Sequence, residues 1–200
     1  MLTVLLTAFE PYGPWQENAS WLALVELTRN MPQEPQVTTR RYPVDFGEVQ
    51  ARLAKDLQAN YDVVLHLGQA PGDKEIRLEA IGLNLGQESS ESPFCLTDNG
   101  PVAFRSELPL ADWTRRIDRA GIPARVSYHA GLYLCNAILY WTHYQAEVQG
   151  LKSRATLLHL PLDSAHGSDQ GSDTPTLPAA TSARAVRLIL EELVAEADGV

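Results

Sequence analysis

Short apolar segments alternate with amphipathic segments along most of this sequence, and the alternation restricts the folds open to it. The apolar run of residues 2–8 ends at two prolines and a glycine, which force a loop. Residues 46–57 then repeat apolar side chains at the spacing of a helix face. Residues 63–68 form a continuous apolar run that ends in glycine, as a short buried strand does. Strand, helix and strand in succession predict helical layers around a mainly parallel sheet.

The remaining segments supply more elements of both kinds. In residues 76–85 the apolar alternation changes phase half-way, which predicts a bulge or a bend around Glu79-Ala80. Residues 86–101 and 164–178 are polar, and we expect loops there, the second of them mobile. We expect helices near residues 21–27, 110–120, 132–148 and 186–194, and strands at residues 37–44, 124–128 and 155–160. With no internal repeat and no dividing linker, residues 1–200 are expected to form one domain, a three-layer α/β/α fold with a mixed, mostly parallel sheet.

The charge balance limits the classes of partner. The chain has 16 Lys and Arg residues against 25 Asp and Glu residues, a formal net charge of −9, and its basic residues are scattered. We therefore expect no nucleic acid and no anionic membrane surface as the main partner. No apolar stretch approaches the roughly 20 residues of a membrane span. The first residues lack the basic start of a signal peptide, and two cysteines are too few for a disulfide scaffold, so we expect a cytoplasmic protein.

Two residues suggest nucleophilic chemistry. Cys135 lies just inside the expected start of a helix, where the positive end of the helix dipole favours a thiolate and free N–H groups can receive an oxyanion. His159 lies at the end of a short apolar strand, and the carboxyl ends of parallel strands are where sites form. A structural alternative exists for each, because a cysteine near a helix start is more often a small buried side chain and a histidine in an apolar strand is more often a core residue.

Further segments strengthen the catalytic interpretation because they carry, in chain order, the motifs of one enzyme family. The sequence FEPYG at residues 9–13, followed by Asn18-Ala19-Ser20, resembles the FEPFG…NPS signature of pyroglutamyl peptidase I, also called pyrrolidone-carboxylate peptidase. LGQA at residues 67–70 resembles the LGQA turn of that family, EAIGLN at 79–84 its ERVAIN strand, AGLYLCN at 130–136 its AGT(F/Y)VCN motif, and LHLP at 158–161 its IHVP motif. The resemblance runs from about residue 5 to residue 162.

The resemblance implies a cysteine peptidase with a phosphorylase/hydrolase-like fold that removes the first residue from peptides with N-terminal pyroglutamate. Cys135 would be the nucleophile, His159 the general base and acid, and Glu79 the carboxylate that orients His159. The reaction would pass through a thioester. The resemblance implies no metal and no organic cofactor, and it implies a homo-oligomer, a dimer or a tetramer.

The same resemblance assigns residues to the substrate. Phe9 and Tyr12 match the aromatic residues that enclose the lactam ring, Asn18 matches the polar residue of NPS, and Gln69 and Ala70 would lie near the amide edge of the ring. The alternatives are that Phe9 and Tyr12 are loop aromatics that cap the core, and that Asn18 or Ser20 is the N-cap of the following helix.

The sequence also departs from the family. The family usually carries an arginine about ten residues after the catalytic glutamate, where it helps to stabilise the oxyanion, and this chain has Ser89 there. Arg77 or Arg105 could substitute from another direction. Loss of one oxyanion donor costs on the order of 100- to 1,000-fold in rate. The alternative function is therefore a relative that keeps the triad but has weak or lost turnover, and that acts as a binding protein or on another small acyl or amide substrate.

A metal site is a weaker hypothesis. The chain offers His66, His129, His143 and His166 with Asp163, but their spacings follow no known ligand pattern, so we expect no metal. Cys95 lies in a polar loop and is expected to have no catalytic role.

Overall fold

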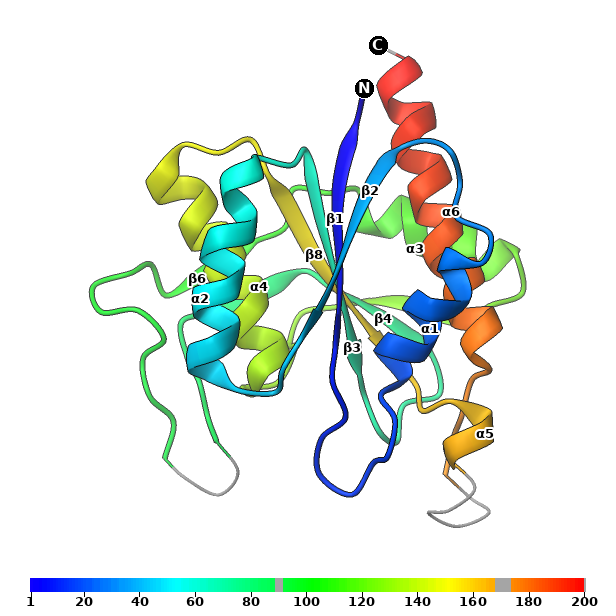
Figure 1. The fold of residues 1–200 in the computed structure, drawn as a ribbon, viewed down its shortest axis with the longest axis horizontal. Coiled ribbons are helices and arrows are strands. Elements are labelled where there is room, and N and C mark those ends of the chain that lie inside the picture. Colours follow the sequence, from blue (N-terminus) through cyan, green and yellow to red (C-terminus); the bar gives the residue numbers. More distant parts are fainter. Residues whose placement is uncertain (89–91, 168–173, 200) are drawn as a thin grey trace.

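The central feature of the fold is a six-stranded mixed sheet (Figure 1). The structure is a computed structural model, and it describes residues 1–88, 92–167 and 174–199. The strand order is β2-β1-β3-β8-β4-β7. The first four strands in this order are parallel, β4 runs antiparallel to β8, and β7 runs parallel to β4. The strands are β1 (Thr3–Phe9), β2 (Gln36–Tyr42), β3 (Val63–Gln69), β4 (Ile76–Glu79), β7 (Ala124–Ser127) and β8 (Arg154–Leu160).

Helices cover both faces of this sheet, which confirms the three-layer α/β/α prediction (Figure 1). One face carries α1 (Ala19–Thr28), α3 (Leu110–Arg119) and α6 (Ala179–Asp198). The other carries α2 (Phe46–Asp56), which continues into the 3₁₀ helix η1 (Leu57–Ala59), and α4 (Leu134–Gln149). The short helix α5 (Ser164–Gly167) follows β8.

The strands are apolar on both sides because both faces of the sheet are covered. Along β1, Val4 and Leu6 pack into the cluster under α1, α3 and α6, whereas Leu5 packs into the cluster under α2 and α4. In β3, Leu65 packs into the cluster under α1, α3 and α6, and Val64 packs into the cluster under α2 and α4. Successive side chains of a strand point to opposite faces, so a continuous apolar run is what a strand between two helical layers requires.

Of the two alternatives predicted around Glu79-Ala80, a bulge within one strand is wrong, and a bend describes this part of the chain better. β4 ends at Glu79, and the chain leaves the main sheet at Ala80 to form β5 (Ile81–Leu83). β5 pairs antiparallel with β6 (Ala103–Arg105), a strand that the sequence analysis missed, in a separate two-stranded sheet. The change of phase therefore marks the passage from one sheet to another. It leaves Glu79 as the last residue of β4, next to β8.

The polar segments behave only partly as expected. Residues 86–88 and 92–101 form a loop, and these described residues include a bridge between Gly86 and Phe94; residues 89–91 lie outside the described part of the chain. Residues 164–178 begin with helix α5, and residues 168–173, on which the expected mobility partly falls, are also outside it.

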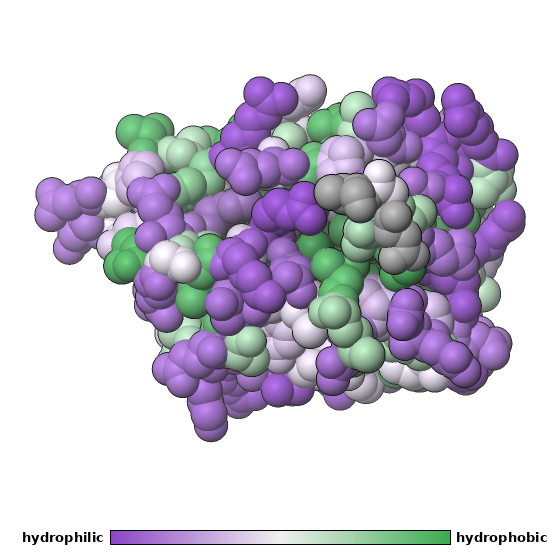
Figure 2. All heavy atoms as spheres, turned by 90° about the horizontal axis from the view of Figure 1, so that it is seen from above, coloured by the Kyte–Doolittle hydropathy of each residue, from purple (hydrophilic) through white to green (hydrophobic). Residues whose placement is uncertain are grey.

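The ends of the sheet differ in character. The amino ends of the parallel strands lie near both termini, and the surface of this end carries mainly hydrophilic side chains with smaller apolar areas between them (Figure 2). The carboxyl ends of β1, β3 and β8 lie at the opposite edge, where the sequence analysis places the site. Among the described residues, no helix combines the length and apolar character that crossing a bilayer requires.

Candidate active site

Cys135 is the second residue of α4, at the helix start that the sequence predicts. The N-cap residue Tyr133 has an extended backbone, and its side chain makes no capping hydrogen bond. The N–H groups of the first turn are therefore not capped by that side chain, and the positive end of the helix dipole is directed at the thiol. The neighbouring Asn136 fixes this start, because its side chain accepts a hydrogen bond from Leu83 N and donates to the carbonyls of Leu83 and Leu85.

His159 and Glu79 meet because β4 and β8 are antiparallel neighbours. In this register Glu79 lies opposite Leu157, and Arg77 lies opposite His159. His159 Nδ1 is 2.7 Å from Glu79 Oε1, and the two side chains are buried, with Glu79 entirely inaccessible to solvent. Thr156 Oγ1 donates a hydrogen bond to the Glu79 carbonyl at 2.9 Å, which holds the end of β4 against β8.

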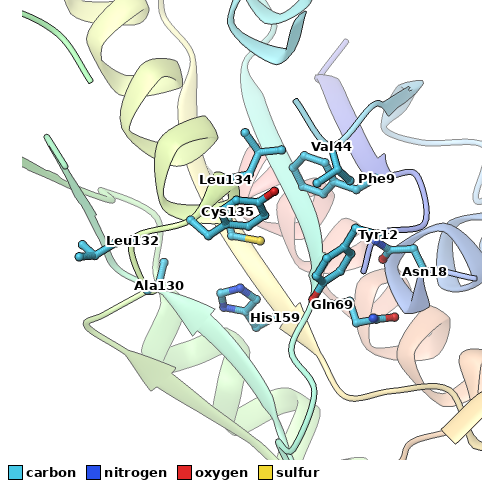
Figure 3. Close-up of a pocket in the computed structure, with 12 residues that line it drawn as sticks. Phe9, Tyr12, Asn18, Val44, Gln69, Ala130, Leu132, Leu134, Cys135 and His159 are labelled. Atoms are coloured by element: carbon cyan, nitrogen blue, oxygen red, sulfur yellow. The ribbon is translucent and has the colours of Figure 1, made fainter. Parts of the chain in front are cut away.

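The thiol of Cys135 lies beside the imidazole of His159, and the two side chains are hydrogen-bonded (Figure 3). Both pack over Gly68 of β3. A Cβ atom at Gly68 would lie 2.7 Å from Cys135 Sγ and 3.3 Å from His159 Cδ2. The glycine therefore makes the space in which the sulfur and the imidazole meet.

The charges of this cluster favour an imidazolium at His159. Burial alone would lower the pKa of His159, but the negative charge and hydrogen bond of Cys135, together with those of Glu79, raise it to about 9. Burial would raise the pKa of Glu79, but hydrogen bonding to His159, the charge of His159, a hydrogen bond from Ser127 and the charge of Arg77 hold it below its usual range. The arrangement is a chain from the partly buried Cys135 thiol through the buried His159 imidazole to the buried Glu79 carboxylate, which is suited to nucleophilic attack and proton transfer.

A cavity of about 150 Å³ opens above Cys135 and His159 (Figure 3). Its lining is mainly apolar and aromatic, and Phe9, Tyr12 and Tyr133 supply the rings. The Tyr12 and Tyr133 rings are 6.5 Å apart between centroids. Burial, followed by the nearby charge of Cys135, raises the pKa of Tyr12 to about 12, so Tyr12 is a neutral phenol at physiological pH. An uncharged planar group of small size suits such a cavity.

A sequence model described as pyroglutamyl peptidase matches residues 2–196. The chain belongs to the pyroglutamyl peptidase family.

Individual relatives agree with this membership. The chain is 30% identical to a pyrrolidone-carboxylate peptidase of Clavibacter michiganensis, over 100% of this chain and 96% of that protein. It is 30% identical to a pyrrolidone-carboxylate peptidase of Yersinia pestis, over 96% of this chain and 90% of that protein. The pyrrolidone carboxyl peptidase structure from Fervidobacterium islandicum superposes with a TM-score of 0.90 at 31% identity, covering 98% and 99% of the two chains. The structure of a mutant pyrrolidone carboxyl peptidase from Pyrococcus furiosus also gives 0.90, at 27% identity, with the same two coverages.

Most of the residues predicted to bind substrate lie around the cavity of this family member. Phe9, Tyr12, Asn18 and Gln69 line it. The carbonyl of the Gln69 side chain accepts a hydrogen bond from Ala19 N at 2.7 Å, and among the described residues its buried amide nitrogen has no hydrogen-bond partner. Ala70 is buried outside the lining, and its N–H donates to the Leu160 carbonyl.

Asn18 combines a place in the lining with a structural role. Its side-chain oxygen accepts hydrogen bonds from the N–H and the hydroxyl of Ser20, which confirms the alternative that it caps α1. Its amide nitrogen donates to the Glu10 carbonyl at 3.0 Å. Asn18 therefore ties the loop after β1 to the start of α1 and so fixes the loop that carries Tyr12.

The arginines named as possible substitutes for the family arginine lie in different places. Arg77 lies on the Glu79 side of His159, with Nη2 at 3.5 Å from His159 Nδ1 and Nε at 3.7 Å from Glu79 Oε1. Arg105 is exposed in the two-stranded sheet. Ser89 lies outside the described residues.

Sequence reasoning missed several residues of the site. Val44, Leu132 and Tyr133 line the cavity, but the sequence placed them at the end of an expected strand and the start of an expected helix, whereas they lie just outside β2 and α4. The sequence marks Gly68 as the glycine at the end of a strand, but it does not show why that position requires glycine. The described residues include no group of three or more histidine, cysteine, aspartate or glutamate side chains able to hold a metal. His66, one of the histidines considered for a metal, is fully buried between Thr7 and Thr142.

Proposed function

We propose that this member of the pyroglutamyl peptidase family hydrolyses the amide bond that follows an N-terminal pyroglutamyl residue, with Cys135, His159 and Glu79 as the catalytic residues. The observation that carries the proposal is the chain of contacts from the Cys135 thiol through His159 to the buried Glu79, at the floor of a small apolar cavity. Membership of the family supports the substrate class, because the relatives named above are pyrrolidone-carboxylate peptidases.

In the first half of the reaction, the Cys135 thiolate attacks the carbonyl carbon of the pyroglutamyl residue and forms a C–S bond. The negative charge that develops on the carbonyl oxygen is stabilised by N–H groups in the first turn of α4. The His159 imidazolium then donates its proton to the leaving nitrogen, the C–N bond breaks, and the shortened peptide leaves with a free amine. A pyroglutamyl thioester remains on Cys135.

In the second half, a water molecule attacks the thioester carbonyl while neutral His159 accepts a proton from it. The C–S bond breaks, pyroglutamic acid leaves, and the thiolate–imidazolium pair is restored. Glu79 keeps its charge throughout. Its hydrogen bond to Nδ1 presents the Nε2 side of the ring to the sulfur and stabilises the imidazolium.

The cavity supports recognition of a lactam. Pyroglutamate has no charged amine, so it loses little hydration when it enters an apolar site between Phe9, Tyr12 and Tyr133. The Gln69 amide supplies polar contact at the rim of the ring. A more open cavity of about 670 Å³ shares Tyr12, Val44, Leu132 and Tyr133 with the first, and it provides room for the peptide beyond the scissile bond.

Release of a fluorophore from pyroglutamyl-aminomethylcoumarin tests this proposal under reducing conditions. Wild type is expected to turn over, Cys135→Ala to lose activity, and Cys95→Ala, at an exposed loop position, to retain it. Ser89→Arg is expected to raise the rate, because it restores the family arginine that is missing from the sequence. If wild type and Ser89→Arg are both inactive, the proposal fails, and the function as a binding protein or on another small acyl or amide substrate becomes the better one.

A further inference from the structure

Arg77 brings a positive charge to the side of the catalytic histidine that faces away from the sulfur. Its Nη2 is 3.5 Å from His159 Nδ1, which is too long for a strong hydrogen bond, and the Nδ1 proton is directed at Glu79 Oε1 at 2.7 Å. Its Nε is 3.7 Å from the same Glu79 oxygen. Arg77 therefore faces the proton-bearing pair and contacts both members of it.

Asp73 balances this charge. Arg77 Nε is 2.7 Å from Asp73 Oδ2, and the two side chains are only partly exposed, 20% for Arg77 and 26% for Asp73. The Asp73 carboxylate lies on the turn before β4 and contacts the same Arg77 Nε atom that is 3.7 Å from Glu79 Oε1. Solvent screens this pair less than a surface ion pair, so removal of either partner changes the field at His159.

The groups that face His159 come from several elements. Glu79 and Arg77 belong to β4, Cys135 to α4, Tyr12 to the loop after β1, and Asp73 to the turn before β4. Tyr12 is neutral because its pKa is about 12. The charges that set the proton affinity of the imidazole are therefore those of Cys135, Glu79, Arg77 and Asp73.

We propose that Arg77 is a positioning residue that, held by Asp73, lowers the proton affinity of the His159–Glu79 pair so that His159 can release its proton during turnover. A thiolate and a carboxylate on either side of an imidazolium hold its proton tightly, and a general base must give up and take back a proton near the working pH. A cation within 4 Å opposes that tight binding. The proposal rests on the assignment of Cys135 and His159 as the reactive pair.

The test is the pH dependence of Cys135 alkylation by iodoacetamide in a Cys95→Ala background, a measurement that needs no substrate. Wild type is expected to show an alkaline inflection where His159 loses its proton. In Arg77→Met this inflection moves up by about 0.5 to 1 pH unit, since the opposing cation is gone and part of its effect was already balanced by Asp73. In Asp73→Asn it moves down, because the cation is no longer balanced.

Matched variants separate charge from structure. Arg77→Lys keeps the charge and is expected to restore most of the wild-type inflection. Arg125 is the residue of β7 that pairs with Arg77, and its Nε is 2.6 Å from Glu75 Oε1. Arg125→Met removes this nearby cation and is expected to leave the inflection at its wild-type pH. The double variant Arg77→Met with Asp73→Asn removes both charges and is expected to return close to wild type.

Shifts of opposite sign in Arg77→Met and Asp73→Asn support the proposal, since loosening of the fold would move both variants in the same direction. Unchanged inflections in both, or shifts of the same sign, overturn it. The outcome is independent of the substrate. Opposite shifts in a protein that does not cleave pyroglutamyl substrates would support the role proposed for Arg77 and would reject the proposed function.

Discussion

Gly68→Ala is a small change that we expect to disable the site while it leaves the fold intact. The added methyl group would lie 2.7 Å from Cys135 Sγ, 3.3 Å from His159 Cδ2 and 3.6 Å from His159 Nε2. Non-bonded carbon atoms in good contact are about 3.5 to 4 Å apart, so the sulfur must move by about 1 Å. A displacement of about 1 Å in reacting groups can cost on the order of 100-fold in rate, and we expect a loss of that size in kcat/KM.

The fold of Gly68→Ala is expected to stay unchanged. Gly68 lies within a regular strand in register with His159, so alanine suits its backbone, and the β1-β3-β8 pairing should survive. Thermal unfolding and the kinetics of pyroglutamyl-aminomethylcoumarin cleavage should be measured together. The matched control is Gly47→Ala in α2, where the new Cβ atom would meet only Asp45 Oδ1 at an ordinary 3.5 Å. A folded Gly68→Ala protein with activity within about twofold of wild type would refute the placement of the thiol over β3.

Three further predictions follow from the charges of the site and the core. Glu79→Gln removes the carboxylate that stabilises the imidazolium, and kcat should fall on the order of 10²- to 10⁴-fold with little change in KM, as steady-state kinetics would show. Activity should decline as pH rises through about 9, because His159 then loses the proton that the leaving amine requires; a profile flat to pH 10.5 would contradict this. Burial, with a smaller effect of the nearby His143 charge, lowers the pKa of His66 to about 3. The His66 imidazole therefore binds a proton less readily in the folded protein than in the unfolded chain. The stability that neutral His66 contributes is present above about pH 6.5 and is lost as pH falls, by about 2–3 kcal/mol between pH 7 and pH 4.5; urea unfolding of wild type and His66→Gln at both pH values measures the difference.

Local patterns mark Cys135 and His159 as candidates, but each signal is weak alone, and the family motifs made them a predicted reactive pair. Cys135 follows the glycine-containing segment that starts an apolar helix, and His159 ends a run of buried residues. The order of strands and helices was predictable because apolar runs with clear periodicity mark most of them. The family motifs added Glu79, which local pattern alone would have left as an ordinary strand residue.

The rest depends on pairings between distant segments. The contact of Arg77 with His159 exists because β4 runs antiparallel to β8, and nothing in a single sequence records that direction. β6 has only three residues, too few for its alternation to be recognised, and the passage from β4 to β5 showed in the sequence only as a change of phase. Gly68 shows the same limit, since its importance lies in the two side chains that occupy the space of its missing Cβ atom.

The most direct test of the central claim is to find the thioester. Wild-type protein would be mixed with a pyroglutamyl substrate, quenched in acid within milliseconds, digested and mapped by mass spectrometry. We expect a pyroglutamyl adduct on the peptide that contains Cys135 and none on the peptide that contains Cys95. Continued substrate cleavage by Cys135→Ala, or an adduct on another residue, would contradict the account.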